Sequence, residues 1–439
     1  MGAHTTADVA GPSAKQPGNR MLANIGWQAL GEVCGRIARL LATVLLARAL
    51  TPFDFGAAAA AITCFEIIRV LLNTGVGQSI IRATDAEIDA TCATAYRISW
   101  ISCILVALLQ VAVGWGMSVY SGRDDLFYMI AALSGVYLIM APGIVNIQLL
   151  LRQNRIKTVT GIATAQNVSD HILTAILALA GFGAWAIVLP KLLTVPIWLF
   201  GARWSQPWTR NKAAGFVPMR DILVYAAPIM GSEIMAAARL HIDKLLVGSV
   251  LGVEALGIYY FAFNAGIGVS LTLTAALAMS SYPHLAEVAH KPRELLARFD
   301  EIMGRTAPLI SLAIAFQAFA ALTYVPLVFG AHWAHAAPLV AMLCVSGITK
   351  SAFDVGQQGL RAAGLTQQDF YASTAFSVVS LIAFKIALWF GLSIAVTTFA
   401  VTACLLQLVF AVWARNQIAA LAGEGYDVAK APRLASVAS

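Results

Sequence analysis

Apolar segments long enough to cross a lipid bilayer follow one another along almost the whole chain. A transmembrane helix needs about 20 mainly apolar residues, and segments of this length recur from residue 22 to residue 414. Only 12% of the residues are charged and the mean hydropathy is +0.76, whereas a soluble domain carries about 25% charged residues. The sequence therefore predicts an all-α integral membrane protein.

We expect twelve transmembrane helices. They are predicted at residues 22–49, 56–81, 93–116, 126–151, 158–180, 183–202, 222–250, 256–283, 304–328, 338–360, 370–391 and 393–414. With the N-terminus inside, the cytoplasmic segments hold eighteen Lys/Arg and the outer loops hold only Arg123. Basic residues concentrate on the cytoplasmic side of membrane proteins, so both termini are expected to be cytoplasmic. The outer loops are too short for an extracytoplasmic domain.

An internal repeat divides the chain into two halves. Ala38-Arg39-Leu40 recurs as Ala238-Arg239-Leu240, and Gly56 matches Gly257 after one inserted residue. Because each half would hold six spans, an even number, both halves enter the membrane from the same side, and parallel repeats leave a cavity between them. The predicted divisions are a disordered cytoplasmic tail (1–21), an N-terminal six-helix bundle (22–202), a cytoplasmic linker (203–221), a C-terminal six-helix bundle (222–414) and a cytoplasmic tail (415–439).

Charged residues fall inside these apolar segments. Each costs about 2.5–3.5 kcal/mol near the bilayer centre on insertion scales, so such residues usually face a protein interior or a wet cavity. The nine cations are Arg36, Arg39, Arg48, Arg69, Lys191, Arg239, Lys244, Lys350 and Lys385. The six anions are Glu32, Glu66, Asp170, Glu233, Asp243 and Asp354. The excess of cations indicates a cavity that binds something negative.

The positions of these charges along each helix suggest different roles. Arg48 lies close to a helix end, where a long basic side chain can reach the interface. Arg36 with Glu32, and Lys350 with Asp354, have the i,i+4 spacing of an ion pair, so a structural and a binding role both stay open. The predicted anion-binding residues are Arg36, Arg39, Arg69, Lys191, Arg239, Lys244, Lys350 and Lys385.

The buried carboxylates are candidates for coupling to protons or sodium ions, because a desolvated carboxylate can titrate near neutral pH. These candidates are Glu66, Asp170, Glu233, Asp243 and Asp354. Asp170 lies in the middle of a span beside His171, so it is the first to test. A fixed counter-ion for a nearby cation is the alternative role for each of them.

Several functional classes are excluded by motifs that the sequence lacks. It has no P-loop, no His/Cys/Asp ligand cluster and no Gly-flanked nucleophilic serine, so we expect neither an enzyme nor a metal or cofactor site. The net charge of +7 is divided between short loops and membrane segments and does not form one surface stripe, so no nucleic-acid partner is expected.

Four groups of motifs resemble the polysaccharide-transport branch, the Wzx-type flippases, of the multidrug/oligosaccharidyl-lipid/polysaccharide exporter superfamily. The first runs from Leu46 to Pro52 with Phe55-Gly56. The second comprises Leu223 to Pro228, Asp243 to Gly248, Leu256 to Tyr260, and Tyr282-Pro283. The third comprises Pro326 to Gly330, His332-Trp333 and Ala336 to Pro338, and the fourth is Arg361 to Gly364.

The resemblance implies a V-shaped pair of six-helix bundles that works by alternating access. Its implied cargo is an undecaprenyl-diphosphate-linked oligosaccharide, moved from the inner to the outer leaflet of the bacterial inner membrane. The cationic cavity of the family corresponds to Arg36, Arg39, Arg69, Arg239 and Lys244, and guanidinium groups suit a diphosphate. A polysaccharide polymerase and chain-length or export proteins are the implied protein partners.

Three alternative functions fit the sequence less well than this interpretation. A drug or metabolite exporter of the same superfamily that moves organic cations would need an acidic cavity, and the excess of cations argues against it. A lipid II flippase is chemically closer but has two additional spans. A polysaccharide polymerase or glycosyltransferase would need a large outer loop or a catalytic carboxylate cluster, and the sequence predicts neither.

Overall fold

The computed structural model describes residues 17–72, 76–211, 213 and 215–423, and every regular element within these ranges is helical. The elements are α1 (Pro17–Ala49), α2 (Pro52–Arg69), η1 (Val70–Leu72), α3 (Val76–Arg82), α4 (Ile88–Ser121), α5 (Asp124–Met140), η2 (Ala141–Gly143), α6 (Ile144–Arg152), α7 (Ile156–Leu179), α8 (Trp185–Leu193), α9 (Val195–Ser205), α10 (Met219–Ala265), α11 (Ile267–Ala286), α12 (Pro292–Glu301), η4 (Ile302–Thr306), α13 (Ala307–Tyr324), η5 (Val325–Phe329), η6 (Ala331–Ala336), α14 (Ala337–Ile348), α15 (Lys350–Ala362), α16 (Thr366–Leu388) and α17 (Leu392–Gly423).

Nine helical segments among the described residues are long and apolar enough to cross a membrane. The chain is therefore a multi-pass, all-helical membrane protein, and the count of twelve spans stays a prediction. The first and last helices extend beyond the predicted spans. α1 begins at Pro17, and α17 continues to Gly423 through residues that were predicted to belong to the C-terminal tail.

Proline and glycine interrupt several of the long helices. α5 and α6 are separated by a short 3₁₀ segment at Pro142, and α8 ends three residues after Pro190. Proline removes a backbone donor and kinks a helix, so these breaks follow from the sequence. Gly252 has φ +84° and ψ −178°, a conformation that glycine adopts easily, and it divides α10 where the seventh predicted span ends.

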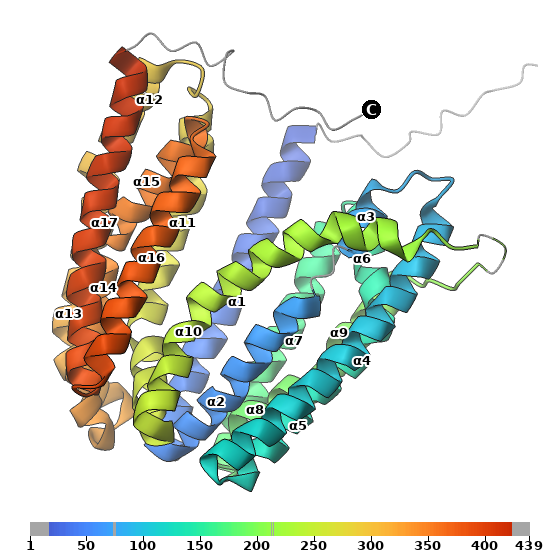
Figure 1. The fold of residues 1–439 in the computed structure, drawn as a ribbon, viewed down its shortest axis with the longest axis horizontal. Coiled ribbons are helices and arrows are strands. Elements are labelled where there is room, and N and C mark those ends of the chain that lie inside the picture. The colour runs from blue at the N-terminus through green and yellow to red at the C-terminus, as the bar shows by residue number, and fades with distance from the viewer. Residues whose placement is uncertain (1–16, 73–75, 212, 214, 424–439) are drawn as a thin grey trace, which may run out of the picture.

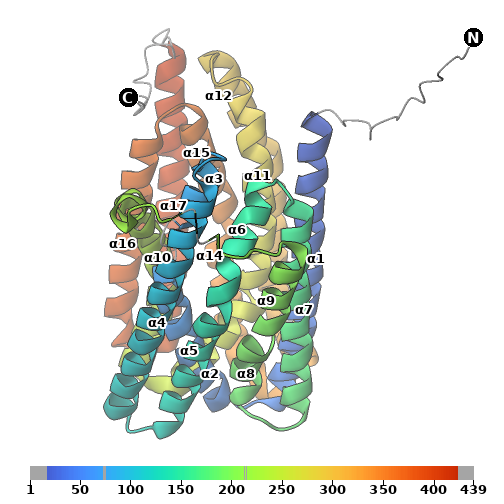
Figure 2. The ribbon, with the colours of Figure 1, turned by 90° about the vertical axis from the view of Figure 1, so that its right-hand side faces the viewer.

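The helices form two groups that diverge toward one end of the molecule (Figure 1). α2 to α9 lie on one side and α11 to α17 on the other, while α10 crosses between them. The end where the groups diverge holds α3, α6 and α12 in both views (Figures 1 and 2). We call it the basic end, because helix ends there carry Arg82, Arg152 and Arg298. The other is called the opposite end.

α2 packs closely against α10, the helix that crosses between the two groups. A Cβ atom at Gly56 would lie 1.8 Å from the carbonyl oxygen of Val253, and one at Gly257 would lie 1.8 Å from the carbonyl oxygen of Pro52. Pro52 and Val253 are 201 residues apart, as are Gly56 and Gly257. The contact is therefore reciprocal between positions that match in the internal repeat, as a parallel repeat would produce.

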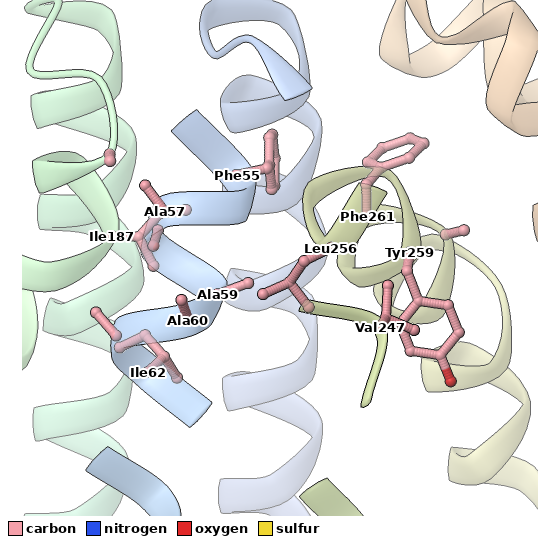
Figure 3. Packing of buried hydrophobic residues seen from close by; sticks show 14 of the residues in the cluster. Phe55, Ala57, Ala59, Ala60, Ile62, Ile187, Val247, Leu256, Tyr259 and Phe261 are labelled. Atoms are coloured by element: carbon pink, nitrogen blue, oxygen red, sulfur yellow. The ribbon is translucent and has the colours of Figure 1, made fainter. Parts of the chain in front are cut away.

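Small side chains let α2 lie in the centre of the molecule. Residues 57–61 are all alanine and all buried. Figure 3 shows this helix between Ile187 of α8 on one side and Leu256 of α10 on the other. Small residues allow helices in a membrane to approach closely and to gain van der Waals contact. This packing places the charged residues of α1, α2, α7 and α8 around one space.

Candidate functional site

A cavity of about 370 Å³ lies between the two groups of helices. Side chains of α1, α2, α7, α8, α10 and α11 line it. Its polar lining residues are Arg39, Thr43, Thr63, Glu66, Asp170, His171, Thr174, Lys191, His241, Lys244, Tyr260 and Asn264. Five of the predicted site residues therefore share one space, and three of these five are cations.

Lys191 and Asp170 form the ion pair that joins α7 to α8. The Lys191 Nζ lies 2.5 Å from the Asp170 Oδ2. Asp170 is only 5% exposed, and its Oδ1 has no hydrogen-bond partner in the structure. A buried carboxylate normally has hydrogen-bond partners at both oxygens, so the second oxygen can still accept a hydrogen bond from another donor.

Lys244 is held by several groups of the C-terminal half. Its Nζ lies 3.2 Å from the Asp243 Oδ1 and 4.0 Å from the centre of the Phe263 ring. The Tyr259 hydroxyl donates to the Asp243 Oδ2 at 2.7 Å. Both charged residues are buried. Asp243 is therefore a counter-ion for Lys244 in this conformation.

Glu66 and Arg69 pair along α2, with the Arg69 Nη2 2.9 Å from the Glu66 Oε2. Glu66 lines the cavity, whereas half of the Arg69 side chain is exposed and its guanidinium lies over the Phe65 ring. Arg39 enters the same space from α1. The lining of the cavity therefore combines a cation from α1 with a carboxylate from α2.

The other predicted site residues whose side chains the structure describes are not among those that line this cavity. Lys350 pairs with Asp354 at 2.7 Å within α15, as the i,i+4 spacing suggested, and Lys385 is exposed on α16. Glu233 is exposed on α10 and Arg36 is partly buried on α1. The side chains of Glu32 and Arg239 lie outside the described residues.

The opposite end is closed by contacts between the two halves. The Trp333 Nε1 donates to the Ala47 carbonyl at 2.7 Å, and the His332 Nε2 lies 2.8 Å from the same oxygen. Trp333 is fully buried, stacks on Phe261 at 3.9 Å between ring centres, and meets Phe55 edge-on at 5.3 Å. We call these three aromatic residues and the two hydrogen bonds to Ala47 the end seal.

Arg48 binds backbone carbonyl groups of the C-terminal half. Its Nε donates to the Val328 carbonyl at 3.0 Å, and its Nη2 donates to the Leu327 carbonyl at 3.3 Å. The side chain therefore joins α1 to η5 at the edge of the end seal. Its position near a helix end predicted contact with the membrane interface, and local spacing gave no sign of partners about 280 residues away.

Comparison with solved structures shows which known fold the chain shares. An inward-facing multidrug resistance transporter of the MATE family, in the MOP superfamily, aligns with a TM-score of 0.70 at 15% identity, over 89% of this chain and 96% of that chain. The lipid II flippase MurJ in an inward closed conformation aligns with a TM-score of 0.69 at 10% identity, over 90% of each chain. The chain therefore shares the fold of these two transporters.

Comparison of sequences identifies the family. The family described as polysaccharide biosynthesis protein matches residues 45–338. The teichuronic acid biosynthesis protein TuaB of Bacillus subtilis is 22% identical over 80% of this chain and 73% of its own length. The succinoglycan biosynthesis transport protein ExoT of Rhizobium meliloti is 22% identical over 74% of this chain and 65% of its own length. The chain belongs to the polysaccharide biosynthesis protein family.

Proposed function

We propose that this protein is a flippase that moves an undecaprenyl-diphosphate-linked oligosaccharide from the inner to the outer leaflet of a bacterial cytoplasmic membrane. The observation that carries the proposal is the cavity lined by Arg39, Lys191 and Lys244 inside an otherwise apolar helical protein. Membership of a polysaccharide biosynthesis family supports a saccharide cargo.

Arg39, Lys191 and Lys244 are the groups that bind the diphosphate first. Charge-assisted hydrogen bonds to phosphate are stronger in a low-dielectric site than in water, so a few cations suffice to hold two phosphate groups. Four other cations of the membrane segments would act at other stages or serve as partners of internal carboxylates: Arg36, Arg69, Arg239 and Lys350. Lys385 is exposed on α16 outside the cavity, so we expect transport not to depend on it.

Alternating access would proceed between two six-helix bundles, with the basic end facing the cytoplasm. Positive charge at that end supports the orientation. The end seal and the contact of Arg48 with η5 would then close the outer side, so this conformation receives substrate from the inside. The outward-open conformation requires these contacts to break.

Ion coupling would use a carboxylate that changes partner during transport. Asp170 and Glu66 line the cavity, and Asp170 has one unpaired oxygen, so they lead the candidates over Glu233, Asp243 and Asp354. Collapsing the proton and sodium gradients in reconstituted vesicles should slow translocation. An unchanged rate after both gradients are collapsed would contradict coupling.

Complementation of a flippase-deficient strain tests the proposed function. The unmodified protein should restore surface polysaccharide, and Arg39→Ala should fail to restore it at equal expression. Lys385→Ala is the matched control, because it removes an intramembrane cation that lies outside the cavity. Restoration by Arg39→Ala would contradict the role of the cavity, and failure of the unmodified protein to restore any polysaccharide would contradict the function.

A further inference from the structure

A long apolar groove runs between α1 and α7 on the lateral surface of the molecule. Its volume is about 1020 Å³. Leu30, Ile37 and Leu41 form the α1 wall, and Ile172 and Ile176 form the α7 wall. All five are more than half exposed, so the groove is open to the side. Both views in which these helices appear place α1 beside α7 (Figures 1 and 2).

Small residues make the groove possible. At Gly31 an added Cβ would lie 2.5 Å from the Thr164 Oγ1, so α1 and α7 touch there. At Gly161 no heavy atom lies within 4 Å of the position of an added Cβ, and Ala165 follows one turn later. The exposed surface between the two helices is therefore a channel with a floor of small residues.

The groove has the length of an extended hydrocarbon chain in a bilayer. Its α1 lining runs from Trp27 to Leu45. At a rise of 1.5 Å per residue this stretch is about 27 Å long. The hydrocarbon core of a bilayer is about 30 Å thick. One chain lying along the groove would therefore pass through most of the apolar depth.

The groove adjoins the charged cavity inside the membrane. Ala42 and His171 line both spaces. On α1, Arg39 and Thr43 line the cavity, whereas Ala38 and Leu41 line the groove. Ala42 lies seven residues before the end of α1, which places the junction about 10 Å from that end. A charged site and an apolar site thus meet within the apolar depth of the helix.

We propose that this groove binds the polyprenyl tail of the lipid-linked substrate while the diphosphate occupies the charged cavity, an inference that rests on the proposed function. A resident phospholipid keeps its head group at the interface and does not need a charged cavity at this depth. A lipid in transit carries its anionic head through the protein interior, and its tail must remain in an apolar environment throughout. The junction at Ala42 and His171 meets both needs.

Photo-crosslinking with a tail-labelled probe tests the inference. The probe is undecaprenyl diphosphate with a diazirine in the tail, added to the full chain in vesicles, and crosslinked residues are mapped by mass spectrometry. We expect crosslinks on the groove faces of α1 and α7. Phosphatidylglycerol carrying the same diazirine should crosslink there at least ten-fold less. Equal crosslinking by both lipids would overturn the inference. Crosslinks of the undecaprenyl diphosphate probe on other helices would overturn it as well.

Substitutions that fill the groove provide the functional test. Gly161→Trp should reduce tail crosslinking and translocation at least ten-fold, and Ala165→Trp provides a second filling variant. Gly116→Trp is the matched control, because Gly116 is also exposed on a membrane helix with no heavy atom within 4 Å of an added Cβ, and it lies outside the groove. Normal translocation by both filling variants would overturn the groove while leaving the flippase intact. Crosslinks in the groove without translocation by the unmodified protein would instead contradict the proposed function.

Discussion

Replacing Lys191 with methionine should destabilise the protein because it leaves the Asp170 carboxylate buried without its cation. Breaking a fully buried ion pair by removing one partner costs about 3–5 kcal/mol. The Lys191 side chain is 32% exposed, so water replaces part of the lost interaction. We therefore expect a loss of about 2–3 kcal/mol in the free energy of unfolding.

The double variant Lys191→Met/Asp170→Asn separates this structural effect from a role in transport. Removing both charges should recover most of the lost stability, since an ion pair in an apolar interior can be replaced by neutral groups at little cost. Translocation should stay impaired, because the diphosphate has lost one of the three cations that line the cavity.

Reversible unfolding in mixed detergent micelles, followed by tryptophan fluorescence, measures the stability of four proteins: the unmodified protein, Lys191→Met, Asp170→Asn and the double variant. A loss below about 0.5 kcal/mol for Lys191→Met, within the range of ordinary surface changes, would refute the view of Asp170 as a buried counter-ion. Wild-type translocation by the stabilised double variant would refute substrate binding by Lys191.

Three further predictions concern the end seal and the internal repeat. Trp333→Phe removes the hydrogen bond to the Ala47 carbonyl, which is worth about 1 kcal/mol net. In a Thr43→Cys background, this substitution should increase labelling of the cavity cysteine by an impermeant thiol reagent added outside. Unchanged labelling would contradict the seal. Gly257→Ala places a methyl group 1.8 Å from a backbone oxygen of α2, so translocation of the substrate in vesicles should fall at least ten-fold. A wild-type rate would show that α2 and α10 need not approach so closely. Arg239→Ala should abolish complementation while expression stays normal, and restored surface polysaccharide would remove Arg239 from the binding residues.

Local sequence patterns predicted the features that depend on neighbours in the chain. Apolar segment length predicted a helical membrane protein, and the i,i+4 spacing of Lys350 and Asp354 predicted their ion pair. The motif containing Gly56 and its match at Gly257 indicated two related halves. These signals are accessible because helix geometry alone determines which nearby side chains share a face.

Contacts between distant helices could not be predicted from the same patterns. Asp170 and Lys191 lie on different helices, so no local spacing revealed their pairing. Arg48 binds carbonyl groups of the other half, and its position near a helix end did not reveal these partners. Lys385 differs from Lys191 in exposure and not in sequence pattern. Burial and tertiary partners, which depend on the packing of whole helices, decide these roles.

The central claim is that cations in one cavity move a diphosphate-linked saccharide across the membrane. The most direct measurement is translocation of a fluorescent undecaprenyl-diphosphate-linked oligosaccharide in vesicles that contain only this protein. Translocation is measured as the increase in the fraction of fluorophore that a membrane-impermeant quencher can reach from outside. We predict rapid translocation with the unmodified protein and with Lys385→Ala, and a rate equal to that of protein-free vesicles with Arg39→Ala. Equal rates for the unmodified protein and for protein-free vesicles, or full activity of Arg39→Ala, would contradict the claim.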